Sequence, residues 1–235
     1  MSQAEPSPPE SFSEEQERAW ATLVSTLRRV IAQTVQLDGG VADYVEANEK
    51  AEALEARLAE FSGGKPVPRF RMPMDKEHPT EMLPYSAISG KLNPLAPPVS
   101  LRCEGERLVA EVSLGGPYEG GLGFVHGGMV AMIWDQVLAL TLVAVDHGGP
   151  TVELTVRYRA PTPINVPLRF EAWLERDEGR KAFLKGQCFA GETLLSEASG
   201  VFVRIASMSR EKGFGSATQR AGRVAERRVK EGQES

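Results

Sequence analysis

Apolar residues in the first quarter of the chain recur at helical spacing, three or four positions apart, from Trp20 onward and again within 41–61. Ser13, three residues before Gln16, forms a capping-box pattern. A pair of glycines interrupts the periodicity after each segment. The spacing predicts two helices, one ending near Leu37 and one over about 41–61. Together they are expected to form a helical hairpin that packs on the main domain or on a partner subunit.

From Val99 onward apolar and polar residues alternate, which is the pattern of half-buried antiparallel strands. The predicted strands cover 99–104, 107–114, 151–159, 168–177, 181–190 and 193–205. A glycine-rich loop and a long apolar segment, 127–145, separate the first two strands from the last four. Asp135 and Gln136 stand in the middle of this segment, and a central Asp costs about 2.5–3.5 kcal/mol on membrane insertion scales. The segment is therefore expected to be a buried helix.

A helix that is apolar nearly all round must be covered on most sides. A curved antiparallel sheet wrapped around one long central helix covers it in this way, so the pattern predicts an α+β hotdog fold. The segment 65–98 contains many prolines, which exclude long regular elements and indicate a connector along the surface. The expected organisation is a helical extension over 1–64, the connector over 65–98, the hotdog domain over 99–206 and a polar, disordered tail over 207–235.

Composition narrows the possible functions. The net charge of −5 offers no concentrated positive surface for nucleic acid. Cys103 and Cys188 are far apart and lack the spacing of a zinc site or a disulfide framework, so we expect reduced thiols and no metal. The amino-terminal residues have neither a basic nor an apolar segment of the kind found in signal peptides, and a cytoplasmic location is expected.

Two features of the apolar helix are candidates for a functional role. A carboxylate at Asp135 is expensive to bury unless it is paired or protonated, so it is either a satisfied structural group or a functional one. At the start of the helix, His126 precedes Gly127 and Gly128. Unpaired amides at a helix N-terminus stabilise a developing oxyanion, and glycine lets a substrate approach them. The alternative is a tight loop that needs glycine only for its turn.

The segment GFVHGGMVAMIWDQVLALTLVA resembles the signature of the PaaI-like hotdog thioesterases, in the subgroup that includes the mitochondrial acyl-CoA thioesterases. In that family an acidic residue follows the histidine by nine positions, as Asp135 follows His126. A threonine precedes a tyrosine by seven positions, as Thr151 precedes Tyr158. The resemblance covers about 99–205, and 82–98 is also similar to a segment that precedes the domain in bacterial members.

The resemblance implies an acyl-CoA thioesterase that needs no cofactor or metal. The Gly127 amide would polarise the thioester carbonyl, with help from Gly128, and Asp135 would act as a general base or as a nucleophile. Thr151 would orient the water or the carboxylate, and His126 would fix the loop rather than transfer protons. The family's active sites form between two subunits, so a homodimer or a dimer of dimers is implied.

Other residues are expected to contact the substrate or to indicate which acyl group it carries. Tyr158 belongs to the family's residue set and is expected at the substrate, and Arg157 and Arg159 match the geometry of CoA phosphates, although they also fit an ordinary surface. Some members carry an asparagine six positions before the histidine, where this chain has Gly120, which favours aliphatic over aryl acyl groups. The alternatives are a hotdog enoyl-CoA hydratase and a non-catalytic acyl-CoA-binding or scaffold protein. The sequence does not fix the acyl-chain length.

Overall fold

A computed structural model of the chain describes residues 13–62, 77–145 and 148–203. The chain divides into two units, Met1–Arg69 and Phe70–Ser235, which are described separately. The segments 1–12 and 207–235, which the sequence predicts to be disordered, lie outside the described residues.

The first unit contains the two helices predicted from apolar spacing, α1 (Glu14–Thr34) and α2 (Val41–Ala59). The capping box at the start of α1 is confirmed. The Ser13 hydroxyl accepts the Gln16 N–H at 3.2 Å, and the Gln16 side chain accepts the Ser13 N–H at 2.8 Å. Before α2, the Tyr44 hydroxyl accepts the Gly39 N–H at 3.0 Å, which closes the turn between the helices.

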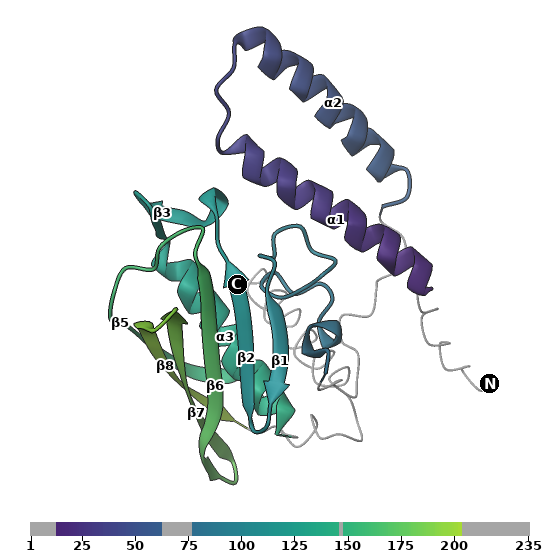
Figure 1. The fold of residues 1–235 in the computed structure, drawn as a ribbon. Helices are drawn as coiled ribbons and strands as arrows, with labels where there is room; N and C mark the ends of the chain where they lie inside the picture. The colour runs from purple at the N-terminus through teal and green to yellow at the C-terminus, as the bar shows by residue number, and fades with distance from the viewer. Residues whose placement is uncertain (1–12, 63–76, 146–147, 204–235) are drawn as a thin grey trace, which may run out of the picture. The chain divides into compact units, whose positions relative to one another are not determined.

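The second unit is built on a six-stranded antiparallel sheet in the order β1-β2-β6-β7-β8-β5 (Figure 1). The strands are β1 (Ser100–Glu104), β2 (Arg107–Ser113), β5 (Thr151–Tyr158), β6 (Pro167–Glu178), β7 (Lys181–Ala190) and β8 (Thr193–Val203). One long helix, α3 (Gly127–Ala144), packs against this sheet. The strands and the helix confirm the α+β hotdog architecture expected from the sequence.

The glycine-rich segment before α3 is more ordered than a loop. It contains a 3-10 turn (Gly116–Tyr118) and a small hairpin, β3 (Glu119–Gly121) and β4 (Phe124–Val125). The Glu119 carboxylate accepts the Gly123 N–H at 2.5 Å and braces the hairpin turn. Alternation could not reveal these strands because they are too short to show a period.

The contact between α3 and the inner face of the sheet forms the core. Trp134 is fully buried, donates its indole N–H to the Ser196 hydroxyl at 3.0 Å, and meets the Phe170 ring edge-on at 4.9 Å. The ring also lies directly over Gly186 of β7, where an added Cβ would come within 2.3 Å of a Trp134 ring carbon. Glycine at position 186 therefore sets how closely the helix approaches the sheet.

The other side of α3 is open in the single chain, which corrects the expectation of a helix covered nearly all round. Asp135 is exposed rather than buried, and the Met132 side chain on the same side is 49% exposed. Edge strand β5 is open too, since Val152 and Tyr158 of its predicted apolar face are exposed. Among the helices of the described residues, α3 is long and apolar enough to cross a membrane by length and composition. The sheet covers one side of it, so an exposed stripe remains on the other.

The described part of the proline-rich connector joins the same core. It contains one 3-10 turn (Pro79–Met82) and otherwise only turns. Met82 and Ile88 are buried in the cluster around α3. The Ser86 hydroxyl accepts the backbone N–H groups of Ile88 and Ser89, and it donates to the Gln136 side chain of α3 at 2.8 Å. The connector is thus attached to α3 through a residue adjacent to Asp135.

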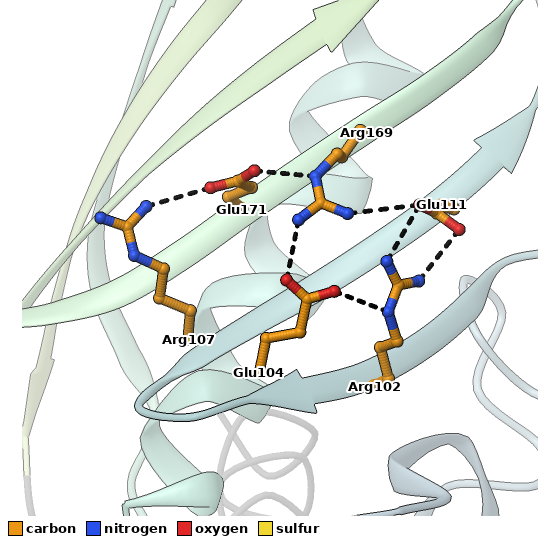
Figure 2. Close-up of polar contacts among 6 residues, drawn as sticks. All are labelled: Arg102, Glu104, Arg107, Glu111, Arg169 and Glu171. Atoms are coloured by element: carbon orange, nitrogen blue, oxygen red, sulfur yellow. Dashed lines mark hydrogen bonds and ion pairs between the residues drawn. The ribbon is translucent and has the colours of Figure 1, made fainter.

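A network of alternating charges links edge strand β1 to β2 and, across β2, to β6 (Figure 2). Its members are Arg102, Glu104, Arg107, Glu111, Arg169 and Glu171. At its centre, the Arg169 guanidinium reaches three carboxylates, Glu171 at 2.7 Å, Glu104 at 2.9 Å and Glu111 at 3.3 Å. Hydrogen bonds from Arg169 and then Arg102 lower the pKa of the Glu104 carboxyl, and a hydrogen bond from Arg102 is the largest cause that lowers the pKa of Glu111.

Gly186→Ala is expected to destabilise the hotdog domain by about 1–3 kcal/mol, because overpacking a filled core forces side chains or backbone to shift. The new Cβ would collide with the buried Trp134 ring. Urea unfolding of the variant and of the wild-type protein measures the decrease in the free energy of unfolding. Gly121→Ala is the matched control, since nothing lies within 4 Å of its added Cβ. Equal stability of the two variants would contradict the close approach of α3 to β7.

Arg169→Gln is expected to lower stability slightly near neutral pH and less in acid, because the network is exposed and screened. The folded pKa values of Glu104 and Glu111 lie below the ordinary value of 4.5. The stability they contribute is therefore present above that value and is lost as the pH falls through the folded values. Melting temperatures at about pH 7 and about pH 3 test this, with Arg180→Gln as the control outside the network. A difference in melting temperature between the wild type and Arg169→Gln that is larger at about pH 3 than at about pH 7 would contradict this prediction.

Candidate active site at the start of the central helix

His126 is the N-cap residue of α3. Its backbone N–H donates to the Tyr118 carbonyl at 2.9 Å, and its Nδ1 accepts the Gly128 N–H at 2.9 Å. A side-chain acceptor at this position satisfies one of the amides that a helix start leaves unpaired. The expectation that His126 fixes the loop fits this geometry.

The two glycine amides are not equivalent. The Gly128 N–H is used by His126, so the expected help from Gly128 at the thioester carbonyl is not available in this arrangement. The Gly127 N–H has no acceptor in the described part of the chain. It lies at the positive end of α3, where the helix dipole favours an oxyanion. Gly127 is therefore the amide free to bind a carbonyl oxygen.

Tyr158, at the end of β5, contacts the same turn. Its hydroxyl donates to the Gly127 carbonyl at 2.7 Å, although the residue lies 31 positions away in sequence. The hydroxyl is thus bonded to the protein backbone, whereas the sequence places Tyr158 among the substrate contacts.

Gly120 lies against His126, which gives the departure noted in the sequence a structural reason. A Cβ at Gly120 would come within 2.6 Å of the His126 Cα and 2.8 Å of its Cβ. With this backbone the hairpin cannot carry an asparagine at that position. The β3–β4 hairpin instead presses its backbone against the histidine.

Asp135 and Thr151 form the second part of the site. The Thr151 hydroxyl, at the start of β5, donates to the Asp135 Oδ1 at 2.9 Å. The resemblance implies that Thr151 orients either the water or the carboxylate, and the hydrogen bond in the structure is to the carboxylate. Since Thr151 occupies Oδ1, the second carboxylate oxygen, Oδ2, is left for other partners. The carboxylate faces the exposed stripe of α3.

A pocket of about 400 Å³ adjoins Gly127 at the start of α3. Its lining is mostly apolar and includes Phe124, Val130 and Pro161, with Tyr158 and Arg159 among the polar members. Pockets of this composition suit an apolar ligand that is oriented by a few polar groups. Alternation and spacing gave no signal for this pocket, because its residues come from β4, α3 and the segment after β5.

Arg157 and Arg159 belong to a different surface. Both line a groove of about 480 Å³, whose other members include Trp173 and Lys185. Arg159 forms an ion pair with Glu197 at 2.5 Å, and its hydrogen bond lowers the pKa of that carboxyl. Arg159 also lines the pocket beside Gly127, but Arg157 does not. Of the two, only Arg159 adjoins the start of α3.

The sequence flagged Gln136 as polar within an apolar helix, but not its partner. Ser86 lies 50 positions earlier in a segment without periodicity, and nothing in the spacing relates the two. Ser86 and Gln136 thus join the site's surroundings as residues that the pattern alone could not pair.

Comparison with known proteins places this site in context. No protein-family model matches the sequence. The chain is 34% identical over 93 residues to the acyl-coenzyme A thioesterase THEM4 of Xenopus laevis, a match covering 38% of this chain and 42% of that protein. It is 28% identical over 93 residues to the acyl-coenzyme A thioesterase THEM5 of Mus musculus, covering 38% of each. The match thus spans about two fifths of these curated relatives.

A solved structure extends the likeness over most of the chain. The crystal structure of the thioesterase superfamily protein RHA08564 is 28% identical, with a TM-score of 0.69, and covers 84% of this chain and 93% of its own. The sheet wrapped on one helix, the similarity to thioesterases in sequence and this structural match agree with one another. The chain has the hotdog fold and is similar in sequence and in structure to thioesterases of that fold.

Proposed function

We propose that the protein hydrolyses an acyl-CoA thioester to a carboxylic acid and CoA. The observation that carries the proposal is that α3 presents two complementary groups. An unpaired Gly127 N–H stands at its positive end, and a carboxylate held by Thr151 stands on its exposed side. The curated relatives are named acyl-coenzyme A thioesterases, which supports the same substrate class.

The electrophile would be activated at Gly127. A thioester carbonyl oxygen bound to that N–H gains negative charge as the carbonyl is attacked, and the amide and the helix dipole then hold it more strongly than in the ground state. The apolar pocket beside Gly127 would take an aliphatic part of the substrate.

The attacking group would be prepared at Asp135. The Thr151 hydroxyl on Oδ1 fixes the carboxylate and leaves Oδ2 to accept a proton from water, or to attack the thioester carbon itself. In the first case water adds directly and CoA leaves as the thiolate. In the second Oδ2 attacks the thioester carbon and displaces CoA as the thiolate, which gives an acyl–aspartyl anhydride that water then hydrolyses to the acid and the free carboxylate. The proposal holds for both routes.

Distance along the helix requires two chains. Asp135 follows Gly127 by eight residues, and at 1.5 Å per residue the two are about 12 Å apart along the axis. One thioester carbon cannot be within reacting distance of both. A second copy facing the exposed stripe of α3 would bring its Asp135 to this chain's Gly127. Two exposed apolar residues support such a homodimer: Met132 on the stripe, and Leu122 between β3 and β4, which is 95% exposed.

The CoA phosphates would be held by Arg159 and Arg157. Guanidinium groups match phosphate oxygens in geometry and charge. Arg159 lines both the pocket beside Gly127 and the groove that contains Arg157, which supports a route for the pantetheine arm from the first to the second.

Asp135→Asn is expected to lower kcat by about 10²–10⁴-fold, the usual value of general-base assistance, or roughly 3–5 kcal/mol of transition-state stabilisation. KM should change little, because the carboxylate acts on the attacking group rather than on CoA. Steady-state hydrolysis of a panel of acyl-CoAs measures both. Asp38→Asn, the same change at an exposed position outside the site, is the control.

The same assays separate the alternatives. A raised KM with unchanged kcat would mean that Asp135 only shapes the pocket. A wild-type protein that binds acyl-CoAs without hydrolysing them would be a binding protein. Hydration of an enoyl-CoA, measured as the loss of its conjugated absorbance, would indicate a hydratase.

Mixed dimers test the shared site. Gly127→Pro removes the critical N–H at the first helical position, where proline is favoured. The extended backbone of His126, with ψ 129, suits a residue before proline. Each variant alone should be nearly inactive. A heterodimer of the Gly127→Pro and Asp135→Asn chains contains one intact site and should recover about half of the wild-type activity per dimer.

Gly127→Ala is the matched control for the proline variant, because it keeps the N–H and its Cβ would make only ordinary contacts with Tyr158 at 3.4 Å or more. No recovery in heterodimers of confirmed mass would sink the two-subunit site, since each chain would then need both groups itself.

A further inference from the structure

Two hydrogen bonds meet at the peptide group that joins Gly127 to Gly128. The Tyr158 hydroxyl donates to its carbonyl oxygen at 2.7 Å, and its N–H donates to the Nδ1 of His126 at 2.9 Å. Tyr158, the peptide group and His126 therefore form one continuous chain of donors and acceptors.

This series of hydrogen bonds determines which nitrogen of His126 carries the proton. A neutral imidazole has one N–H donor and one acceptor. Because Nδ1 accepts the Gly128 N–H, the proton must lie on Nε2. Protonation of both nitrogens would turn Nδ1 into a donor and break the bond.

The packing of the ring leaves that Nε2–H free. One edge of the imidazole lies against the hairpin, where a Cβ at Gly120 would be 3.0 Å from the ring's Cδ2. The other edge lies against Gly128, where a Cβ would be 3.0 Å from Nδ1. Nε2 lies between these two edges on an exposed residue and has no hydrogen-bond partner among the described residues. The Nε2–H is thus a free donor on the residue that directly precedes Gly127, whose own N–H is also free.

Hydrogen bonds in series strengthen one another. A donor on a peptide carbonyl increases the polarisation of the same peptide's N–H, so the Tyr158 hydroxyl strengthens the bond from Gly128 to His126. Without the hydroxyl the peptide group is less strongly held, and the His126 ring gains freedom to change tautomer or to turn.

We propose that Tyr158 is a positioning residue that acts through the Gly127–Gly128 peptide group. Its hydroxyl holds His126 in the Nε2–H tautomer, and this N–H is the second donor to the thioester group beside the Gly127 N–H. The inference rests on the proposed thioesterase function for its catalytic part. It assigns Tyr158 to the backbone rather than to the substrate, and it gives the exposed histidine a donor role.

Nitrogen-15 NMR of the imidazole rings tests the positioning part without any substrate. The chain has three histidines, and the His126 signals are identified by their loss in His126→Gln. In the wild-type protein at mildly alkaline pH, His126 should show the Nε2–H tautomer predominantly. In Tyr158→Phe its two nitrogen shifts should move towards each other, as expected when the tautomers mix. A predominant Nδ1–H form in the wild type, or unchanged shifts in Tyr158→Phe, would overturn the proposal.

Acyl-CoA hydrolysis tests the catalytic part. Tyr158→Phe should lower kcat by about 10–100-fold, less than the roughly 10²–10³-fold loss on removing an oxyanion donor outright. KM should stay within about threefold. A substrate contact would instead raise KM. Mixed tautomers with unchanged kcat would show that the Nε2–H does not serve the reaction and would overturn this part.

Two controls separate Tyr158 from a general loosening of the fold. Tyr44→Phe makes the same change at a hydroxyl that only closes the turn before α2, and it should alter neither readout. Thr151→Val removes the other hydrogen bond from β5 to α3, so it should lower kcat while leaving the His126 tautomer unchanged. If the wild-type protein hydrolyses no acyl-CoA, the proposed function fails, while the NMR result still decides the positioning role of Tyr158.

Discussion

The close contact between α3 and the sheet is the constraint on which the rest of this structure depends. The Trp134 ring lies over Gly186 with no room for a further carbon atom, and its indole N–H is bonded to buried Ser196. This contact fixes the helix in both distance and rotation. Asp135 is the next residue along the helix, about 100° further round, so it is directed away from the core. The same packing that stabilises the domain therefore decides which side of the helix carries the carboxylate.

The two glycine amides at the start of α3 differ in whether they are hydrogen-bonded within the protein. One amide, of Gly128, is used by the histidine cap, and another, of Gly127, remains open. The cap is held in turn by the β3–β4 hairpin, whose backbone lies against His126 at Gly120. A larger side chain at position 120 would displace the histidine and, with it, the division of the amides. The hairpin is thus part of the site although it contributes no reactive group.

Two segments from different parts of the chain hold the middle of α3. Thr151 of edge strand β5 bonds Asp135, and Ser86 of the connector bonds the adjacent Gln136. The stripe of α3 that neither segment nor the sheet covers contains Met132 and Asp135. An exposed apolar stripe with one fixed carboxylate fits the proposed homodimer, in which Gly127 and Asp135 of one site would come from different chains.

The sequence by itself predicted the main elements and the candidate reactive groups. Helical and alternating periods gave the two amino-terminal helices, the six long strands and α3, because these elements are long enough to show a period. The spacing of His126, Asp135, Thr151 and Tyr158 resembles that of the PaaI-like thioesterases. Only the tertiary structure decided that Asp135 is exposed, that the Gly128 amide is occupied, and that Tyr158 bonds the backbone while Arg157 lines a separate groove. Most of those outcomes depend on contacts between residues far apart in the chain, such as Trp134 with Gly186 and Tyr158 with Gly127. Periodicity shows which side of an element is apolar, but it does not show what lies against that side.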